Sequence, residues 1–277
     1  MAVTGKRVAA IGDNCIDLYV PPIGRAGVGG QALNVAVYWR RLGLVSEYLG
    51  AVGDDEDGEK VRRALREAGV IADRIRVLPG VTGLTRFAIS PRGERQIVFE
   101  DLGVCADYAP TIDDLEHLSG AHLVHCAQLA DLRSPARYLS GRGVRVSYDF
   151  SVVAETEELE AFDTVFYGID SGPDDDEAIE VAARAVQAGA GLAVVTRGAH
   201  GSLVFDGREV IRAKAMPVEP VDTCGAGDSF AAAFLASRLD GAPLEACLEA
   251  ASAAASQAVQ HLGAWPQDLE ARLEVST

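Results

Sequence analysis

Residues 221–230 read Val-Asp-Thr-Cys-Gly-Ala-Gly-Asp-Ser-Phe, and an apolar run to Leu239 follows directly. The run predicts a helix, and the small residues ahead of it are Gly225, Ala226 and Gly227. The first N–H groups of a helix have no intrahelical partner, and together with the positive end of the helix dipole they attract anions. The Asp228 carboxylate is expected at the rim of this anion site. An anion site beside a base suits phosphoryl transfer to a hydroxyl, although a loop followed by a capped helix explains the same residues.

The composition limits the class of protein. A chain of 277 residues with 48% hydrophobic residues suits one large α/β domain with a full core. Its net charge of −16 disfavours nucleic acid and anionic lipid as partners. Without a long apolar run or a signal-like N-terminus, we expect no membrane partner and a cytoplasmic location. The five cysteines form no Cys-x-x-Cys pair, which argues against a disulfide framework or a zinc site, and we interpret Cys224 as a buried side chain rather than a nucleophile.

Strand-like and helix-like segments alternate along the chain, which is typical of a parallel sheet covered on both faces. The expected strands are Val8–Gly12, Ser46–Val52, 122–126, 144–149, 163–167, 192–196 and Ser202–Phe205. The expected helices are Ala32–Leu42, Gly58–Ala68, 175–188, 226–238 and 244–261.

One stretch, residues 73–100, departs from this alternation. Thr82–Ser90 has period-two patterning at Thr85–Ile89, and a short Pro91-Arg92-Gly93 turn joins it to Arg95–Glu100. Ile75–Leu78 precedes these segments, so we predict a hairpin inserted in the α/β chain. Together with a strand near Asp17–Val20, it would form a lid over a single domain, residues 1–277, the lid comprising about 14–28 and 80–102. A hairpin at the edge of the main sheet is the alternative.

Common nucleotide motifs are absent or out of context. The chain has no P-loop, and Gly27-x-Gly29-x-x-Ala32 lacks the strand that must precede a dinucleotide fingerprint, so we reject an NAD-dependent oxidoreductase. Three polar, glycine-flanked features follow or precede predicted elements, and each is also explained by an ordinary turn or cap. They are Gly12-Asp13-Asn14, Gly29-Gly30 with Asn34, and the loop Thr196–Gly201.

These motifs resemble a known family. Gly29-Gly30-x-x-x-Asn34 and Asp222-Thr-x-Gly-Ala-Gly-Asp228 are similar to the two signatures of ribokinase-like (PfkB) carbohydrate kinases, and Thr196-x-Gly198-x-x-Gly201 fits that family's nucleotide loop. Ile11–Asp17, Asn34–Tyr38, Val52–Asp55 and Gln260–Trp265 look like the fructoselysine 6-kinase branch. The resemblance implies a three-layer α/β/α fold with a mainly parallel sheet and a small β-sheet lid. It also implies ATP-dependent phosphorylation of a sugar hydroxyl with Mg²⁺, allows K⁺, and suggests a homodimer through the lid.

The resemblance further assigns roles to individual residues. The catalytic base would be Asp228, and the anion hole would be formed by the N–H groups of Gly225, Ala226 and Gly227. Sugar binding would fall to Asp13, Gly29, Gly30 and Asn34, and nucleotide binding to Thr196, Gly198, Gly201 and, at the adenine wall, Ser252. A monovalent-cation loop would contain Asp222 and backbone carbonyls near Gly263.

The sequence also departs from the family pattern and leaves the substrate open. The family's Asn-x-x-Glu, tied to Mg²⁺, is replaced by Asp170–Glu177, in which Asp174 or Asp175 could supply a carboxylate. A fructosamine such as fructoselysine, phosphorylated at its 6-hydroxyl, is the leading substrate; fructose, ribose, 2-keto-3-deoxygluconate and a nucleoside are alternatives. Glu100 and Asp101 are candidates for binding a cationic tail, or else solvated edge charges. A catalytically silent sugar- or nucleotide-binding regulator is the competing function.

Overall fold

The computed structural model describes residues 5–90, 95–151, 157–169, 172 and 174–272. Within them, eight strands form a central sheet that is parallel from β4 to β12 and antiparallel at β13 and β14. In spatial order the strands are β14 (Val210–Ala213), β13 (Ser202–Phe205), β12 (Ala193–Thr196), β11 (Thr164–Gly168), β10 (Arg145–Asp149), β9 (Leu123–Ala127), β1 (Arg7–Gly12) and β4 (Val45–Leu49). The prediction of a mainly parallel sheet is confirmed.

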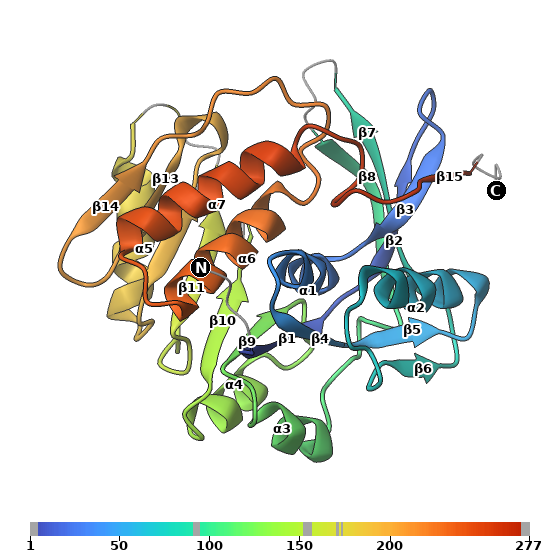
Figure 1. The fold of residues 1–277 in the computed structure, drawn as a ribbon, viewed down its shortest axis with the longest axis horizontal. Coiled ribbons are helices and arrows are strands. Elements are labelled where there is room, and N and C mark those ends of the chain that lie inside the picture. Colours follow the sequence, from blue (N-terminus) through green and yellow to red (C-terminus); the bar gives the residue numbers. More distant parts are fainter. Residues whose placement is uncertain (1–4, 91–94, 152–156, 170–171, 173, 273–277) are drawn as a thin grey trace.

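Helices cover both faces of this sheet, as the three-layer expectation requires (Figure 1). One face carries α1 (Gln31–Arg41), α6 (Ala226–Leu239) and α7 (Leu244–Ala258), with α2 (Glu56–Ala68) beside α1. The other face carries α3 (Ile112–Leu118), α4 (Arg133–Ser140) and α5 (Asp176–Gln187). Because side chains alternate along a strand, Val8 and Ala10 join the first core whereas Ala9 and Ile11 join the second.

A second sheet stands to one side of the central sheet (Figure 1). It contains, in order, β15 (Glu270–Ala271), β3 (Arg25–Gly29), β2 (Cys15–Tyr19), β7 (Thr82–Ile89) and β8 (Arg95–Gly103). The predicted hairpin corresponds to the antiparallel pair β7–β8, and its turn, residues 91–93, lies outside the described residues. The pairing register of β7 and β8 shifts between Arg86 and Phe87. Such an irregularity changes which side chains share a face of the sheet, so residues from the start and from the end of β8 can face the same side.

One strand prediction was wrong in detail. Ser46–Val52 is not one strand: the chain bends at Gly50 between β4 and β5 (Ala51–Gly53), and a Cβ at Gly50 would lie 2.1 Å from the Tyr48 hydroxyl. The predicted strand Ile75–Leu78 is present as β6 (Arg76–Leu78), and it pairs in parallel with β5. Among the helices of the described residues, none combines the length and the apolar composition needed to cross a bilayer.

Candidate active site

A cavity of about 460 Å³ lies at the carboxyl edge of the parallel strands, the usual ligand position in open α/β sheets. Five of its lining residues end or follow β1, β9, β10, β11 and β12: Asp13, Gln128, Asp149, Gly168 and Thr196. The second sheet supplies another wall through β2, β7 and β8, and the start of α6 closes the floor. Residues far apart in the sequence therefore meet in one chamber.

The start of α6 is the predicted anion site. Gly225 precedes the helix with φ +72°, and a Cβ there would lie 2.3 Å from the Ala264 carbonyl oxygen, so only glycine fits. Gly225 and Gly227 line the cavity, but Ala226 does not, and its N–H bonds the Thr223 carbonyl at 3.3 Å. Two of the three predicted anion-hole residues thus face the chamber.

Asp228 lies in the first turn of α6 and faces the same chamber. Its Oδ2 accepts a 2.7 Å hydrogen bond from Asn34 Nδ2, which joins the two sequence motifs across the site. The pKa of Asp228 is raised to about 8, chiefly by burial and also by the nearby Asp149 and Asp13 carboxylates, against the lowering effect of the Asn34 hydrogen bond. Asn34 Oδ1 is buried with no hydrogen-bond partner among the described residues. A base of this pKa and a free amide acceptor suit the binding and deprotonation of a hydroxyl.

The other predicted sugar residues mainly hold the backbone around the site in position. Asp13 accepts hydrogen bonds from the N–H groups of Gln31 at 2.7 Å and Ala32 at 3.0 Å, and so holds the start of α1. Gly30 has φ +113°, and a Cβ there would lie 2.4 Å from the Asn14 Cα. Gly29 does not line the cavity, yet a Cβ on it would lie 2.0 Å from Asp17 Oδ2.

Three charged side chains that line the cavity were missed from the sequence. Asp17, on β2, is 4% exposed, and burial raises its pKa to about 6. Asp149 ends β10, and burial raises its pKa to about 6 as well. Arg95, on β8, reaches across the chamber until its Nη1 lies 3.5 Å from the Cys224 sulfur. Asp149 could have been found, because it ends a predicted strand as Asp13 follows one; Arg95 has no local signal.

The predicted nucleotide residues are only partly brought together. Thr196 lines the cavity, whereas Gly198 and Gly201 flank a short turn beyond β12 and Ser252 is buried in α7, all outside the lining. A Cβ at Gly201 would lie 2.2 Å from the Ala213 carbonyl oxygen, which explains that glycine structurally.

Candidate metal ligands lie near the same edge of the sheet. Asp174, Asp175 and Asp176 offer carboxylate oxygens within 4.8 Å of one another, although Asp175 also bonds Arg212 Nε at 2.5 Å. Asp170, Ser171 and Pro173 lie outside the described residues.

The predicted cation loop is buried behind the anion site. Asp222 is fully buried, and the Gly263 N–H lies 3.0 Å from its Oδ2. The neighbouring Cys224 thiol is also buried, and burial raises its pKa, which makes it a poor nucleophile, as expected.

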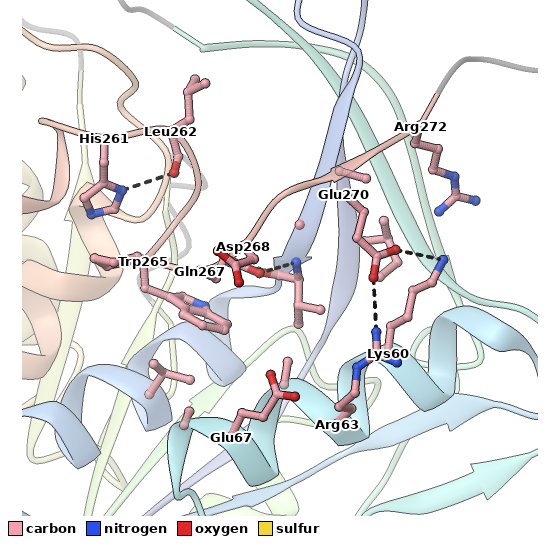
Figure 2. Close-up of a pocket in the computed structure, with 18 of the residues that line it drawn as sticks. Lys60, Arg63, Glu67, His261, Leu262, Trp265, Gln267, Asp268, Glu270 and Arg272 are labelled. Atoms are coloured by element: carbon pink, nitrogen blue, oxygen red, sulfur yellow. Dashed lines mark hydrogen bonds and ion pairs between the residues drawn. The ribbon is translucent and has the colours of Figure 1, made fainter.

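A larger cavity of about 1010 Å³ lies elsewhere, between α1, α2 and the C-terminal segment 261–272 (Figure 2). Glu270 bridges its rim by ion pairs to Lys60 at 3.5 Å and Arg63 at 3.1 Å. None of the predicted site residues lines it, and two of its cations are already paired with Glu270. The smaller cavity, which holds Asp228, is therefore the candidate active site.

Comparisons with known proteins show what the whole chain is similar to. The model of the pfkB family of carbohydrate kinases matches residues 7–140 and 151–271. A fructoselysine 6-kinase of Shigella flexneri is 35% identical, over 94% of this chain and 100% of that protein. A fructosamine kinase of Bacillus subtilis is 34% identical, over 83% of this chain and 82% of that protein. The structure of Arabidopsis thaliana ribokinase with ribose and ATP superposes with a TM-score of 0.79 at 26% identity, covering 93% of each chain.

The family match spans most of the chain, and the relatives are similar over nearly their whole length. The chain therefore belongs to the pfkB family of carbohydrate kinases.

Proposed function

We propose that this protein is an ATP-dependent sugar kinase that phosphorylates a fructosamine such as fructoselysine, at its 6-hydroxyl. The observation that carries the proposal is the position of Asp228, a buried carboxylate in the first turn of α6 beside Gly225 and Gly227. A base and an anion site that share one chamber are what transfer of a phosphoryl group to a hydroxyl requires.

The chemistry follows from these groups. Asp228 takes the proton of the sugar hydroxyl, whose oxygen forms a bond to the γ-phosphorus while the bond to the ADP oxygen breaks. The N–H groups at the start of α6 stabilise the charge on the transferred phosphoryl oxygens. Arg95 approaches the same place from the second sheet and adds a fixed positive charge. Asn34 orients Asp228 through the 2.7 Å hydrogen bond.

Mg²⁺ is the metal that this reaction implies, and oxygen ligands are those it prefers. Asp174, Asp175 and Asp176, which lie within the segment that replaces the family's usual motif, offer such oxygens and would hold it. When bound, Mg²⁺ neutralises phosphate charge. ATP would extend from Thr196 towards Gly198, Gly201 and Ser252 along the sheet edge.

Carboxylates on the second sheet favour a substrate with a positive charge. Asp17 pairs with Thr85, and Thr85 pairs with Glu100, so one ladder across the sheet carries two carboxylates that line the cavity. Asp101 instead bonds the Gly103 N–H at 2.8 Å and does not line the cavity. We therefore assign the binding of the cationic part of the fructosamine to Glu100 rather than to Asp101.

A substrate screen tests the proposal. Coupled ADP release is measured with fructoselysine, fructose, ribose, 2-keto-3-deoxygluconate and a nucleoside; the highest kcat/KM is expected with fructoselysine. Glu100→Gln should lower kcat/KM for fructoselysine but not for fructose, and Asp101→Asn, the matched control, should leave both unchanged. Nucleotide binding without any phosphorylated product would instead support a silent regulator.

We also propose that the second sheet, about residues 14–28 and 80–102, acts as a lid and as the contact of a homodimer. It already forms one wall of the cavity, so its closure would exclude water. β8 is its edge strand and exposes Val98 and Phe99, and edge strands tend to pair. Light scattering that gives a monomer would contradict the dimer.

A further inference from the structure

The Asp222 carboxylate lies where the family resemblance would place a monovalent cation, and both of its oxygens already accept hydrogen bonds. Oδ1 accepts from the Cys224 N–H at 2.9 Å. Oδ2 accepts from the Tyr19 hydroxyl and from the Gly263 N–H, the latter at 3.0 Å. Asp222 and Tyr19 are both fully buried, so these donors, rather than water, compensate the carboxylate.

These donors do not suit a cation. K⁺ is held by oxygen atoms that point their lone pairs at it, whereas here N–H and O–H groups point their hydrogens at the carboxylate. Gly263 contributes its N–H, which also lies 2.7 Å from the Tyr19 hydroxyl oxygen, rather than its carbonyl. The nearby Ala264 carbonyl accepts a 2.6 Å hydrogen bond from the Tyr38 hydroxyl, and the Val259 carbonyl accepts one of 2.7 Å from the Val221 N–H.

Tyr19 is also held firmly in this position. It lies on β2, and its ring packs edge-on against Phe87 of β7 with centroids 4.5 Å apart. Its hydroxyl thus connects the second sheet to the loop that leads directly into Gly225. A cation bound to Asp222 would hold this loop in place by stabilising the carboxylate. The Tyr19 hydroxyl stabilises the same carboxylate by its hydrogen bond, so it can hold the loop in the same way.

We propose that Tyr19 replaces the monovalent cation at Asp222, and that this enzyme works without K⁺. Tyr19 is then a positioning residue: it fixes the loop 222–225 and, through it, the anion site. The activity part of this inference rests on the proposed kinase function, whereas the cation-binding part does not.

The kinetic test compares KCl with tetramethylammonium chloride at constant ionic strength. The wild-type kcat should differ by less than about twofold, because no cation binds. Tyr19→Phe should lower kcat by about tenfold, as expected for one hydrogen bond to a charged group, with a smaller effect on KM. K⁺ should restore part of this loss, since removal of the hydroxyl donor leaves a lone pair of Asp222 Oδ2 free to face a cation. Tyr38→Phe, the matched control on the Ala264 carbonyl, should gain no response to K⁺.

Thermal unfolding in the same two salts needs no turnover. The wild-type Tm should be equal in both, whereas the Tm of Tyr19→Phe should rise in KCl, because a ligand that binds only the folded state stabilises it. A wild-type enzyme that K⁺ activates severalfold or stabilises would overturn the proposal. So would a Tyr19→Phe enzyme that is as fast as wild type, or one that is slow in both salts. Failure of all sugars as substrates would refute the kinase function and leave the unfolding test valid.

Discussion

Replacing Asp228 with asparagine should slow turnover by orders of magnitude and stabilise the folded protein. The pKa of Asp228 rises from 3.8 to about 8 on folding, chiefly because the carboxyl group is buried. At pH 7 the unfolded chain ionises this group while the folded chain keeps it largely protonated. Because pH 7 lies about 3 units above the unfolded pKa, keeping the proton costs on the order of 4 kcal/mol of unfolding free energy. Asparagine is neutral in both states and can still accept the hydrogen bond from Asn34.

The stability gained by Asp228→Asn should depend on pH. A group whose pKa is raised by folding costs nothing below its unfolded pKa, near pH 3.8, and costs most above its folded pKa, near pH 8. The advantage of Asp228→Asn should therefore be small at pH 4 and grow up to pH 8, where it reaches several kcal/mol. At roughly 2–4 °C per kcal/mol, the Tm should rise by about 10 °C at neutral pH.

Two assays check the two halves of the prediction. Urea unfolding followed by circular dichroism at pH 4, 6 and 8 measures stability, and coupled ADP release measures kcat. We expect kcat to fall by about 100- to 10,000-fold, the contribution of a general base, while ATP still binds. A variant no more stable than wild type at pH 8, or one with near-normal turnover, would refute the reasoning.

Three further predictions concern the same chamber. The kcat/KM for the sugar should rise with pH through about 8, because Asp228 must lose its proton before it can act; a flat profile from pH 6 to 9 would speak against Asp228 as the base. Gly225→Ala should cost about 2 kcal/mol or more, because its φ is +72° and the new Cβ would meet the Ala264 carbonyl. Gly227→Ala meets no atom within 4 Å, so equal losses of unfolding free energy in the two variants would contradict this account. Arg95→Met should lower kcat by about tenfold or more with little change in Tm, and unchanged kinetics would remove Arg95 from the mechanism.

The periodicity of the sequence predicted the layered fold because long apolar segments dominate it. Periodicity failed to predict elements that are short or that are interrupted by a bend. Gly50 breaks one predicted strand in two, and α3, only seven residues long, is set mainly by the Thr111 capping box. Such elements depend on a few local hydrogen bonds that apolar patterning does not reveal.

The site was predictable only where its residues lie in local motifs. Asp228 and Asn34 stand in glycine-flanked stretches, and the structure joins them by a hydrogen bond. Arg95 and Tyr19 carry no such signal, because their roles depend on how the second sheet folds over the start of α6. Gly29 stays a predicted sugar contact, and the structure adds that its missing side chain makes room for the Asp17 carboxylate.

The most direct test of the central claim is phosphorus NMR of the product. Wild-type protein is incubated with ATP, Mg²⁺ and fructoselysine, with the Asp228→Asn variant as the control. The account predicts a new phosphomonoester signal coupled to the protons at carbon 6, formed together with ADP by the wild type and not by the variant. Formation of the same phosphomonoester by the variant at the wild-type rate would contradict Asp228 as the base. ADP release with inorganic phosphate as the only other product would contradict sugar phosphorylation itself.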